Sequence, residues 1–229
     1  MRQLSHGMLI VVDGPSGCGK DSLLEKLKIR INRLHFNAYI KSEEDLDTER
    51  HQIMEARMKG VGKGGYGDKE MAEELVLHRS HIYRRVFEPI FWNGGTVLAN
   101  RGEPATLAYQ TARGEVDMDY VWYLHRTYKI RVPDLVVVTL CSPRIAIARE
   151  RGDQNIEIRK ERESGSGLSG KVTREEGLSE IEKIKRREII HSQYERAIEF
   201  LEFKGVHVVR LDTEKITVNE EADLVCTLI

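Results

Sequence analysis

The chain has 229 residues, of which 40% are hydrophobic and 32% are charged, a composition typical of a folded globular domain. Its formal net charge of −1 gives no overall field that would attract nucleic acid or an anionic membrane, so any phosphate group must be bound at a local site. The three cysteines lie far apart without metal-ligand spacing, and the longest apolar runs are far shorter than the ~20 residues that span a bilayer, so we expect a single cytoplasmic domain, residues 1–229, with no nucleic-acid or membrane partner.

Short apolar segments alternate along the chain with segments of helical periodicity. The apolar segments are Met8–Asp13, Phe36–Lys41, Gly95–Asn100, Leu135–Cys141 and Gly205–Leu211, and the intervening helical segments include Glu43–Lys59 and Lys69–Trp92. Neighbouring parallel strands need a crossover helix between them. The alternation therefore predicts an α/β fold, in which a five-stranded parallel sheet carries helices on both faces.

A glycine-rich loop follows the first predicted strand. Gly14–Lys20 matches the pattern G-x-x-x-x-G-K and stands between a strand and a helix, where the backbone N–H groups of such a loop converge on phosphate oxygens. The lysine of the pattern, Lys20, is expected to contact the β- and γ-phosphates and act in catalysis. The loop predicts a P-loop NTPase fold that binds ATP. The expected ATP-binding residues are Gly14, Pro15, Ser16, Gly17, Cys18, Gly19, Lys20, Asp21 and Ser22.

The residue after the lysine differs from the usual pattern. Asp21 stands where a serine or threonine normally binds Mg²⁺, and Asn100 stands at the end of the third predicted strand, where an aspartate is common in such sites. We interpret the two changes as compensating, with the Mg²⁺-linked carboxylate at Asp21 and an amide at Asn100. The alternative is that Asp21 only stabilises the start of the helix through its charge.

Several segments carry a resemblance to known kinase families. The loop resembles that of the ribose bisphosphate kinases of phosphonate metabolism, which share its Lys-Asp-Ser, and its Gly-Pro-Ser-Gly start is similar to guanylate kinase. Most of the chain resembles thymidylate kinase, above all Asn100–Gln110, which is similar to that family's Asp-Arg-Tyr followed by Leu-Ala-Tyr-Gln. This resemblance implies a kinase that transfers a phosphoryl group from ATP to a nucleoside monophosphate, dTMP or a related nucleotide, and it suggests a homodimer.

The resemblance to thymidylate kinase also implies the residues that bind the acceptor. Arg101 would hold the acceptor's phosphate and act in catalysis, since a guanidinium binds phosphate oxygens in a bidentate manner. The other acceptor-binding residues would be Arg79, Thr106, Tyr109 and Gln110. Leu75 stands where that family places a base-stacking phenylalanine, and Ser16 where it has an aspartate. The alternatives are therefore a kinase of a phosphorylated sugar, such as ribose bisphosphate, or a nucleotide-binding P-loop protein without catalysis.

A highly charged segment, at about residues 151–176, interrupts two helical stretches and is expected to form a lid over the ATP site. The phosphate loop contains no arginine, and phosphoryl transfer often uses one to offset the developing charge. Arg151 is the expected catalytic residue of this lid. The other candidates in and next to this segment are Arg149, Arg159, Arg162, Lys171 and Arg174. A solvated run of charges is the alternative interpretation, because acidic residues alternate with the basic ones.

Overall fold

The computed structural model describes residues 7–34, 36–42, 68–112, 114–152 and 179–229. The predicted helix Glu43–Lys59 and nearly all of the predicted lid, with Arg159, Arg162, Lys171 and Arg174, lie outside the described residues. Among the helices that are described, none combines the length and the hydropathy needed to cross a membrane.

The centre of the molecule is a parallel sheet, as predicted. Its strands are β1 (Leu9–Asp13), β2 (Ala38–Lys41), β3 (Thr96–Asn100), β4 (Leu135–Leu140) and β5 (Val208–Asp212). The strand order is β2-β3-β1-β4-β5, and every neighbouring pair is parallel. The central position of β1 puts the loop that follows it between the carboxyl ends of β3 and β4.

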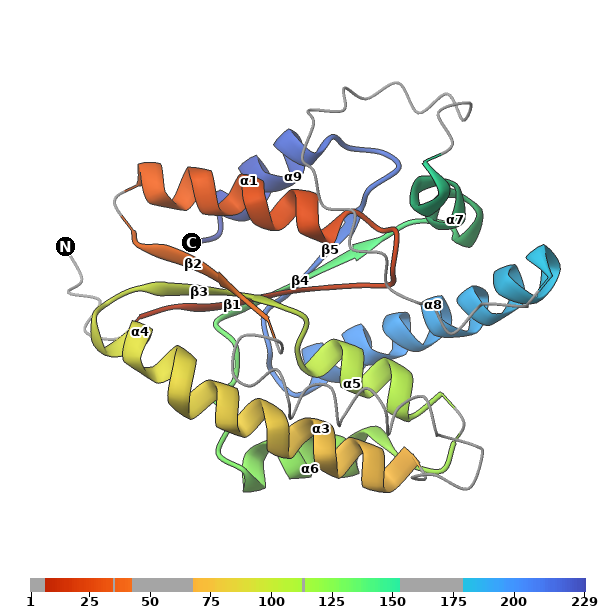
Figure 1. Ribbon diagram of the computed structural model, residues 1–229, viewed down its shortest axis with the longest axis horizontal. Helices are drawn as coiled ribbons and strands as arrows, with labels where there is room; N and C mark the ends of the chain where they lie inside the picture. The colour runs from red at the N-terminus through yellow and green to blue at the C-terminus, as the bar shows by residue number, and fades with distance from the viewer. Residues whose placement is uncertain (1–6, 35, 43–67, 113, 153–178) are drawn as a thin grey trace.

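Helices cover both faces of the sheet (Figure 1). They are α1 (Lys20–Arg33), α3 (Asp68–Ile82), the π-helix η2 (Tyr83–Phe87), α4 (Glu88–Trp92), α5 (Glu103–Gln110), α6 (Met118–Thr127), α7 (Pro143–Arg151), α8 (Glu180–Phe203) and α9 (Val218–Cys226). Successive side chains of a strand point to opposite faces. In β1, Ile10 and Val12 accordingly pack with α1 and α9, whereas Leu9 and Val11 pack in the core formed with α3, α5, α6 and α8. The predicted α/β architecture is confirmed.

Two elements differ from the sequence-based prediction. The last strand begins at Val208 and not at Gly205, because Gly205 has a φ of 79° and ends α8 with a hydrogen bond from its N–H to the Glu202 carbonyl. The predicted helical segment Lys69–Trp92 is interrupted by the π-helix η2. Pro89 follows directly in α4 and has no N–H to donate to the preceding turn, which favours wider hydrogen bonding there.

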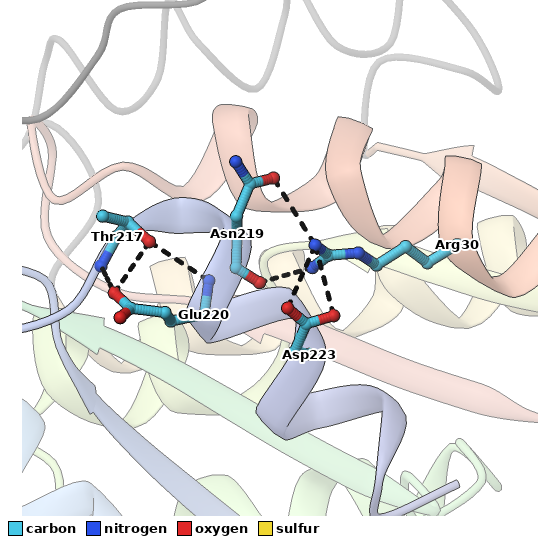
Figure 2. A network of polar contacts seen from close by, with 5 residues as sticks. All are labelled: Arg30, Thr217, Asn219, Glu220 and Asp223. Carbon is cyan, nitrogen blue, oxygen red and sulfur yellow. Dashed lines mark hydrogen bonds and ion pairs between the residues drawn. The ribbon is translucent and has the colours of Figure 1, made fainter.

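An arginine on α1 links that helix to α9 (Figure 2). The Arg30 guanidinium donates to the Asn219 carbonyl and to the Asp223 carboxylate, at 3.2 Å from the latter. The start of α9 is closed by a capping box, in which the Thr217 hydroxyl accepts from the Glu220 N–H and the Glu220 carboxylate accepts from the Thr217 N–H. The two helices therefore meet through ordered polar contacts as well as through the apolar core.

Replacing Arg30 by alanine is expected to lower the free energy of unfolding by about 1 kcal/mol, because a partly exposed ion pair contributes little and the carbonyl contact adds one hydrogen bond. Urea denaturation of the purified variant measures this. Arg33→Ala, an exposed change at the end of the same helix, is the matched control and should change stability by less than about 0.5 kcal/mol. A loss for Arg30→Ala no larger than for the control would contradict the role of this contact.

Candidate active site

The phosphate loop lies against β4 and α7. Gly14 has a φ of 141°, and a Cβ atom there would lie 2.2 Å from the Thr139 carbonyl oxygen. Gly17 has a φ of 80°, and its Cβ would lie 2.4 Å from the Ala146 carbonyl oxygen. Both the left-handed backbone and the close approach require glycine at these positions. The loop is therefore held in a curved path by its neighbours, with its last residues opening α1.

Lys20 lies inside this curve. Its side chain is buried, and Nζ donates to the Pro15 carbonyl at 3.0 Å. Burial lowers the pKa of Lys20 from its ordinary value, and the nearby Arg101 guanidinium lowers it further. The ammonium therefore lies at the centre of the loop, close to a second cation. Two neighbouring cations favour the binding of an anion such as a phosphate group.

Asp13 joins the phosphate loop to the next segment of the site. The side chain is fully buried at the end of β1. Its Oδ1 accepts from the Gly14 N–H at 2.7 Å and from the Tyr194 hydroxyl at 2.9 Å. Its Oδ2 accepts from the N–H groups of Gly102 and Ala105, both at 2.9 Å, at the start of α5. One carboxylate thus fixes the loop, the N-terminus of α5 and the middle of α8.

Replacing Asp13 by asparagine is expected to lower the free energy of unfolding by about 2–3 kcal/mol, since the new NH₂ group must face at least one buried backbone N–H whichever way the amide turns. Chemical denaturation measures the change. Tyr194→Phe is the matched control: it removes one hydrogen bond to the same carboxylate and should cost about 1 kcal/mol. If the two variants lost equal free energy of unfolding, the hydrogen bonds from backbone N–H groups to Asp13 would make no measurable contribution to stability.

Asp21 and Asn100 lie together, although 79 residues separate them in the sequence. The Asn100 Nδ2 donates to the Asp21 Oδ1 at 3.1 Å. The oxygen of the same amide, Asn100 Oδ1, is buried and has no hydrogen-bond partner among the described residues. A buried oxygen of this kind carries an energetic cost unless it meets a donor, a water molecule or a cation.

The pair suits a Mg²⁺ ion in its chemistry. Carboxylate and amide oxygens are the ligands that Mg²⁺ prefers, and the ion usually takes only one or two protein ligands and completes its shell with water and phosphate oxygens. Within the described ranges no group of three or more His, Cys, Asp or Glu side chains could hold a metal ion by itself. The chemistry of Asp21 and Asn100 therefore fits a Mg²⁺ ion, and their role in holding one stays a prediction.

Arg101 follows directly after β3 with a φ of 76°, which is unusual for a residue with a side chain. Its N–H donates to the Val12 carbonyl at 3.0 Å, so the strained turn is anchored to the central strand. The turn brings the guanidinium near Lys20 and Tyr109, whose pKa values respond to its charge. Strain of this kind is often found where function requires a fixed side-chain position.

Arg79 is buried on α3, where its guanidinium contacts side chains of α5 and α6. Its Nη1 lies 2.9 Å from the Thr106 hydroxyl and 2.8 Å from His125 Nε2. His125 is fully buried, and its Nδ1 lies 2.8 Å from the Val121 carbonyl, which can only accept; Nδ1 therefore carries the proton and Nε2 accepts from Arg79. Burial, followed by the charge of Arg79, holds the pKa of His125 well below its usual value. The neutral imidazole thus orients the guanidinium.

A narrow cleft connects the two arginines. Arg79, Arg101 and Asn100 line it together with side chains of β1, η2 and Lys41. Its volume is about 30 Å³, so a bound acceptor requires side chains along it to move. Leu75, at the position expected for a stacking aromatic, is buried one turn before Arg79 on the same helix.

Glu103 also lines this cleft and is buried at the start of α5. Its Oε1 forms an ion pair with Arg126, whose guanidinium lies 4.3 Å from the centre of the Trp122 ring. Burial raises the pKa of Glu103 to about 7, against the opposing effect of Arg126. The carboxyl group therefore changes its protonation near neutral pH.

The remaining predicted site residues lie on α5 and α7. Tyr109 is partly buried on α5, with its ring 5.9 Å from that of Tyr194, and burial raises its pKa. Gln110 ends the same helix. Arg151 is exposed at the end of α7 and pairs with Glu180 at 3.4 Å. Its predicted role as the lid cation stays a prediction.

Comparisons with known proteins agree with one another. A family model described as thymidylate kinase matches residues 12–220. The chain is 28% identical over 134 residues to a thymidylate kinase of Afipia carboxidovorans, covering 58% of each chain. It is 29% identical over 147 residues to one of Rhodopseudomonas palustris, covering 63% of each. A thymidylate kinase of Deinococcus radiodurans is 30% identical over 112 residues, 48% of this chain and 52% of the relative. The chain thus spans about three fifths of the length of the first two relatives.

Proposed function

The chain belongs to the thymidylate kinase family, and from this premise we propose that it transfers the γ-phosphoryl group of ATP to a nucleoside monophosphate, dTMP or a close relative. The observation that carries the proposal is the convergence of Lys20 and Arg101 at the carboxyl ends of β1 and β3, linked through Asp13. Lys20 belongs to the loop that would bind the donor, and Arg101 to the segment that would bind the acceptor.

Each group then has one task in the transfer. The N–H groups of the phosphate loop and the Lys20 ammonium bind the β- and γ-phosphates and offset the charge that develops between them. Arg101 binds the acceptor's phosphate and presents its oxygen in line with the γ-phosphorus. Bound Mg²⁺ would supply charge neutralisation at the donor, held by Asp21 and Asn100. Positioning and charge stabilisation account for most of the catalysis in this class of reaction.

The far end of the acceptor would meet Arg79. The Arg79 guanidinium, which contacts His125 and Thr106, can only donate hydrogen bonds, and this suits a carbonyl oxygen of a pyrimidine base. The amino group of a base such as cytosine would instead place a second hydrogen-bond donor against the Arg79 guanidinium. The arrangement therefore favours a thymine-like or uracil-like base over cytosine.

A kinase of a phosphorylated sugar is the second candidate, because Leu75 offers no aromatic ring on which a base could stack. An ADP-release assay with ATP and Mg²⁺ across deoxy- and ribonucleoside monophosphates and ribose phosphates separates the two. The proposal expects the highest kcat/KM with dTMP or dUMP. Release only with ribose phosphates would favour the sugar kinase, and nucleotide binding without any acceptor-dependent release would favour a protein that binds nucleotide passively.

The domain organisation, assembly and location belong to the same proposal. We expect one kinase domain whose charged segment near 151–176 closes over ATP, a homodimer as the family resemblance suggests, and a cytoplasmic location. Cys18, Cys141 and Cys226 are all free thiols, which supports a reducing compartment. Analytical ultracentrifugation of the purified chain tests the dimer.

A further inference from the structure

Two cysteines that are far apart in the sequence lie in contact where the phosphate loop packs against the end of β4. Cys18 lies within the loop, and Cys141 directly follows β4. Their sulfur atoms are 3.2 Å apart, and both side chains are buried in a small cluster with Ala146 of α7. The third thiol, Cys226, lies elsewhere, on α9. The two thiol groups have no part in the phosphoryl transfer proposed above.

The backbone around the pair can adapt to a shorter sulfur–sulfur distance. A disulfide bond is about 2.05 Å long, so the two sulfur atoms must approach by about 1 Å. Cys18 stands between Gly17 and Gly19, which have φ values of 80° and 86°. A Cβ atom at Gly19 would meet nothing within 4 Å, so this side of the loop has space to move.

A small oxidant can reach the pair from one side. Cys141 lines a cavity of about 440 Å³, whose walls include His191 of α8 and Asp212 of β5. The hydrogen bond from Cys141 lowers the pKa of Cys18, and the charges of Lys20 and Arg149 lower it further, whereas the pKa of Cys141 is raised. Cys141 thus borders the cavity, and Cys18, whose sulfur lies 3.2 Å from that of Cys141, is the better thiolate.

We propose that Cys18 and Cys141 form a site of reversible oxidation, where hydrogen peroxide joins them in a disulfide that draws the phosphate loop out of its ATP-binding conformation. The proposal goes beyond the kinase activity, because it concerns a covalent modification that needs no acceptor.

The reaction has two balanced steps. The sulfur of Cys18, the better thiolate, attacks one peroxide oxygen; the S–O bond forms, the O–O bond breaks, and the leaving oxygen takes up the thiol proton to become water. The sulfur of Cys141 then attacks that of the Cys18 sulfenic acid; the S–S bond forms, the S–O bond breaks, and the leaving hydroxide takes the remaining thiol proton. The two thiols lose two electrons and two protons, and peroxide is reduced to water.

The cross-link should act on ATP binding through the loop backbone. Cys18 lies two residues before Lys20 in the phosphate loop, so a displacement of about 1 Å there would move the groups that would bind the γ-phosphate. Misplacement by that distance can cost about 100-fold in rate. We expect ATP affinity to fall at least about tenfold on oxidation and to return after treatment with a dithiol reductant.

The experiment treats the full reduced chain with hydrogen peroxide and follows three readouts: free-thiol count, peptide mapping by mass spectrometry, and ATP binding by calorimetry. The expected result is a peptide joining Cys18 to Cys141, loss of the corresponding thiols and weakened ATP binding, all reversed by dithiothreitol. Cys226→Ser should behave as the wild type. Cys141→Ser should bind ATP normally and keep this binding after peroxide.

Three outcomes would overturn the proposal. They are the absence of the joined peptide in oxidised wild-type chain, a cross-link that leaves ATP binding unchanged, and equal loss of ATP binding in wild type and Cys141→Ser. Peptide mapping of the wild type does not depend on whether the variant folds. Because thiol count and peptide mapping need neither ATP nor an acceptor, failure of the proposed kinase activity would be recognised separately.

Discussion

Replacing Lys20 by alanine is expected to lower turnover by 10²–10³-fold, the loss typical of removing one preorganised charge-stabilising group from a transition state. The structure gives this residue a defined position: its ammonium lies inside the phosphate loop, against the Pro15 carbonyl and close to Arg101. Without Lys20, the γ-phosphoryl group would contact the N–H groups of the phosphate loop, but the loop would provide no cation. ADP release, coupled to NADH oxidation at saturating ATP and acceptor, measures the effect.

The control must separate lost chemistry from lost folding. Lys28→Ala changes a partly exposed lysine two turns further along α1 and should leave turnover within about twofold. The Lys20→Ala variant should remain folded, because burial of its ammonium is unfavourable and the removal relieves that cost. A decrease of less than about threefold in a folded Lys20→Ala variant is incompatible with the assigned role of this lysine.

The fold was predictable because the inner strands of the sheet are nearly continuous apolar runs. Leu9–Asp13 and Leu135–Leu140 are buried along their whole length, and no other element explains such short runs bounded by turns. The errors occur where the conformation depends on neighbouring residues. Gly205 directly precedes the apolar residues of the last strand but ends a helix. The apolar spacing of the π-helix before Pro89 does not distinguish it from the surrounding α-helix.

The site was predictable only where its residues are contiguous or carry a family pattern. Gly14–Lys20 is a single motif, and Arg101 follows a strand in a recognisable segment. Asp13 was not recognised, although an acidic residue at the end of an apolar strand next to the loop was an available signal. His125 offered none, since it contacts Arg79 across 46 residues from a helix with ordinary amphipathic spacing. Long-range pairs of this kind appear only when the helices are packed.

The interpretation of Asp21 and Asn100 as compensating changes predicts how substitutions at these two positions affect turnover. Asp21→Asn should lower Mg²⁺-dependent turnover by at least about 100-fold, since the site loses its carboxylate and the nucleotide loses a preorganised counter-charge. Asn100→Asp should not improve turnover, because a second carboxylate would then face the Asp21 Oδ1 that now accepts from the amide at 3.1 Å. Steady-state ADP release over a Mg²⁺ titration measures both variants.

The double variant Asp21→Asn with Asn100→Asp decides between a metal role and a capping role. It restores one carboxylate and one amide in exchanged positions, so a site that needs one hard anionic ligand should regain most of the turnover lost in Asp21→Asn, with a similar Mg²⁺ dependence. If Asp21 only stabilises the start of α1 through its charge, Asp21→Asn should cost less than about 1 kcal/mol of stability and leave turnover intact. Full turnover of Asp21→Asn would therefore show that the Asp21 carboxylate does not bind the metal ion, because neither residue of this variant's pair carries a carboxylate.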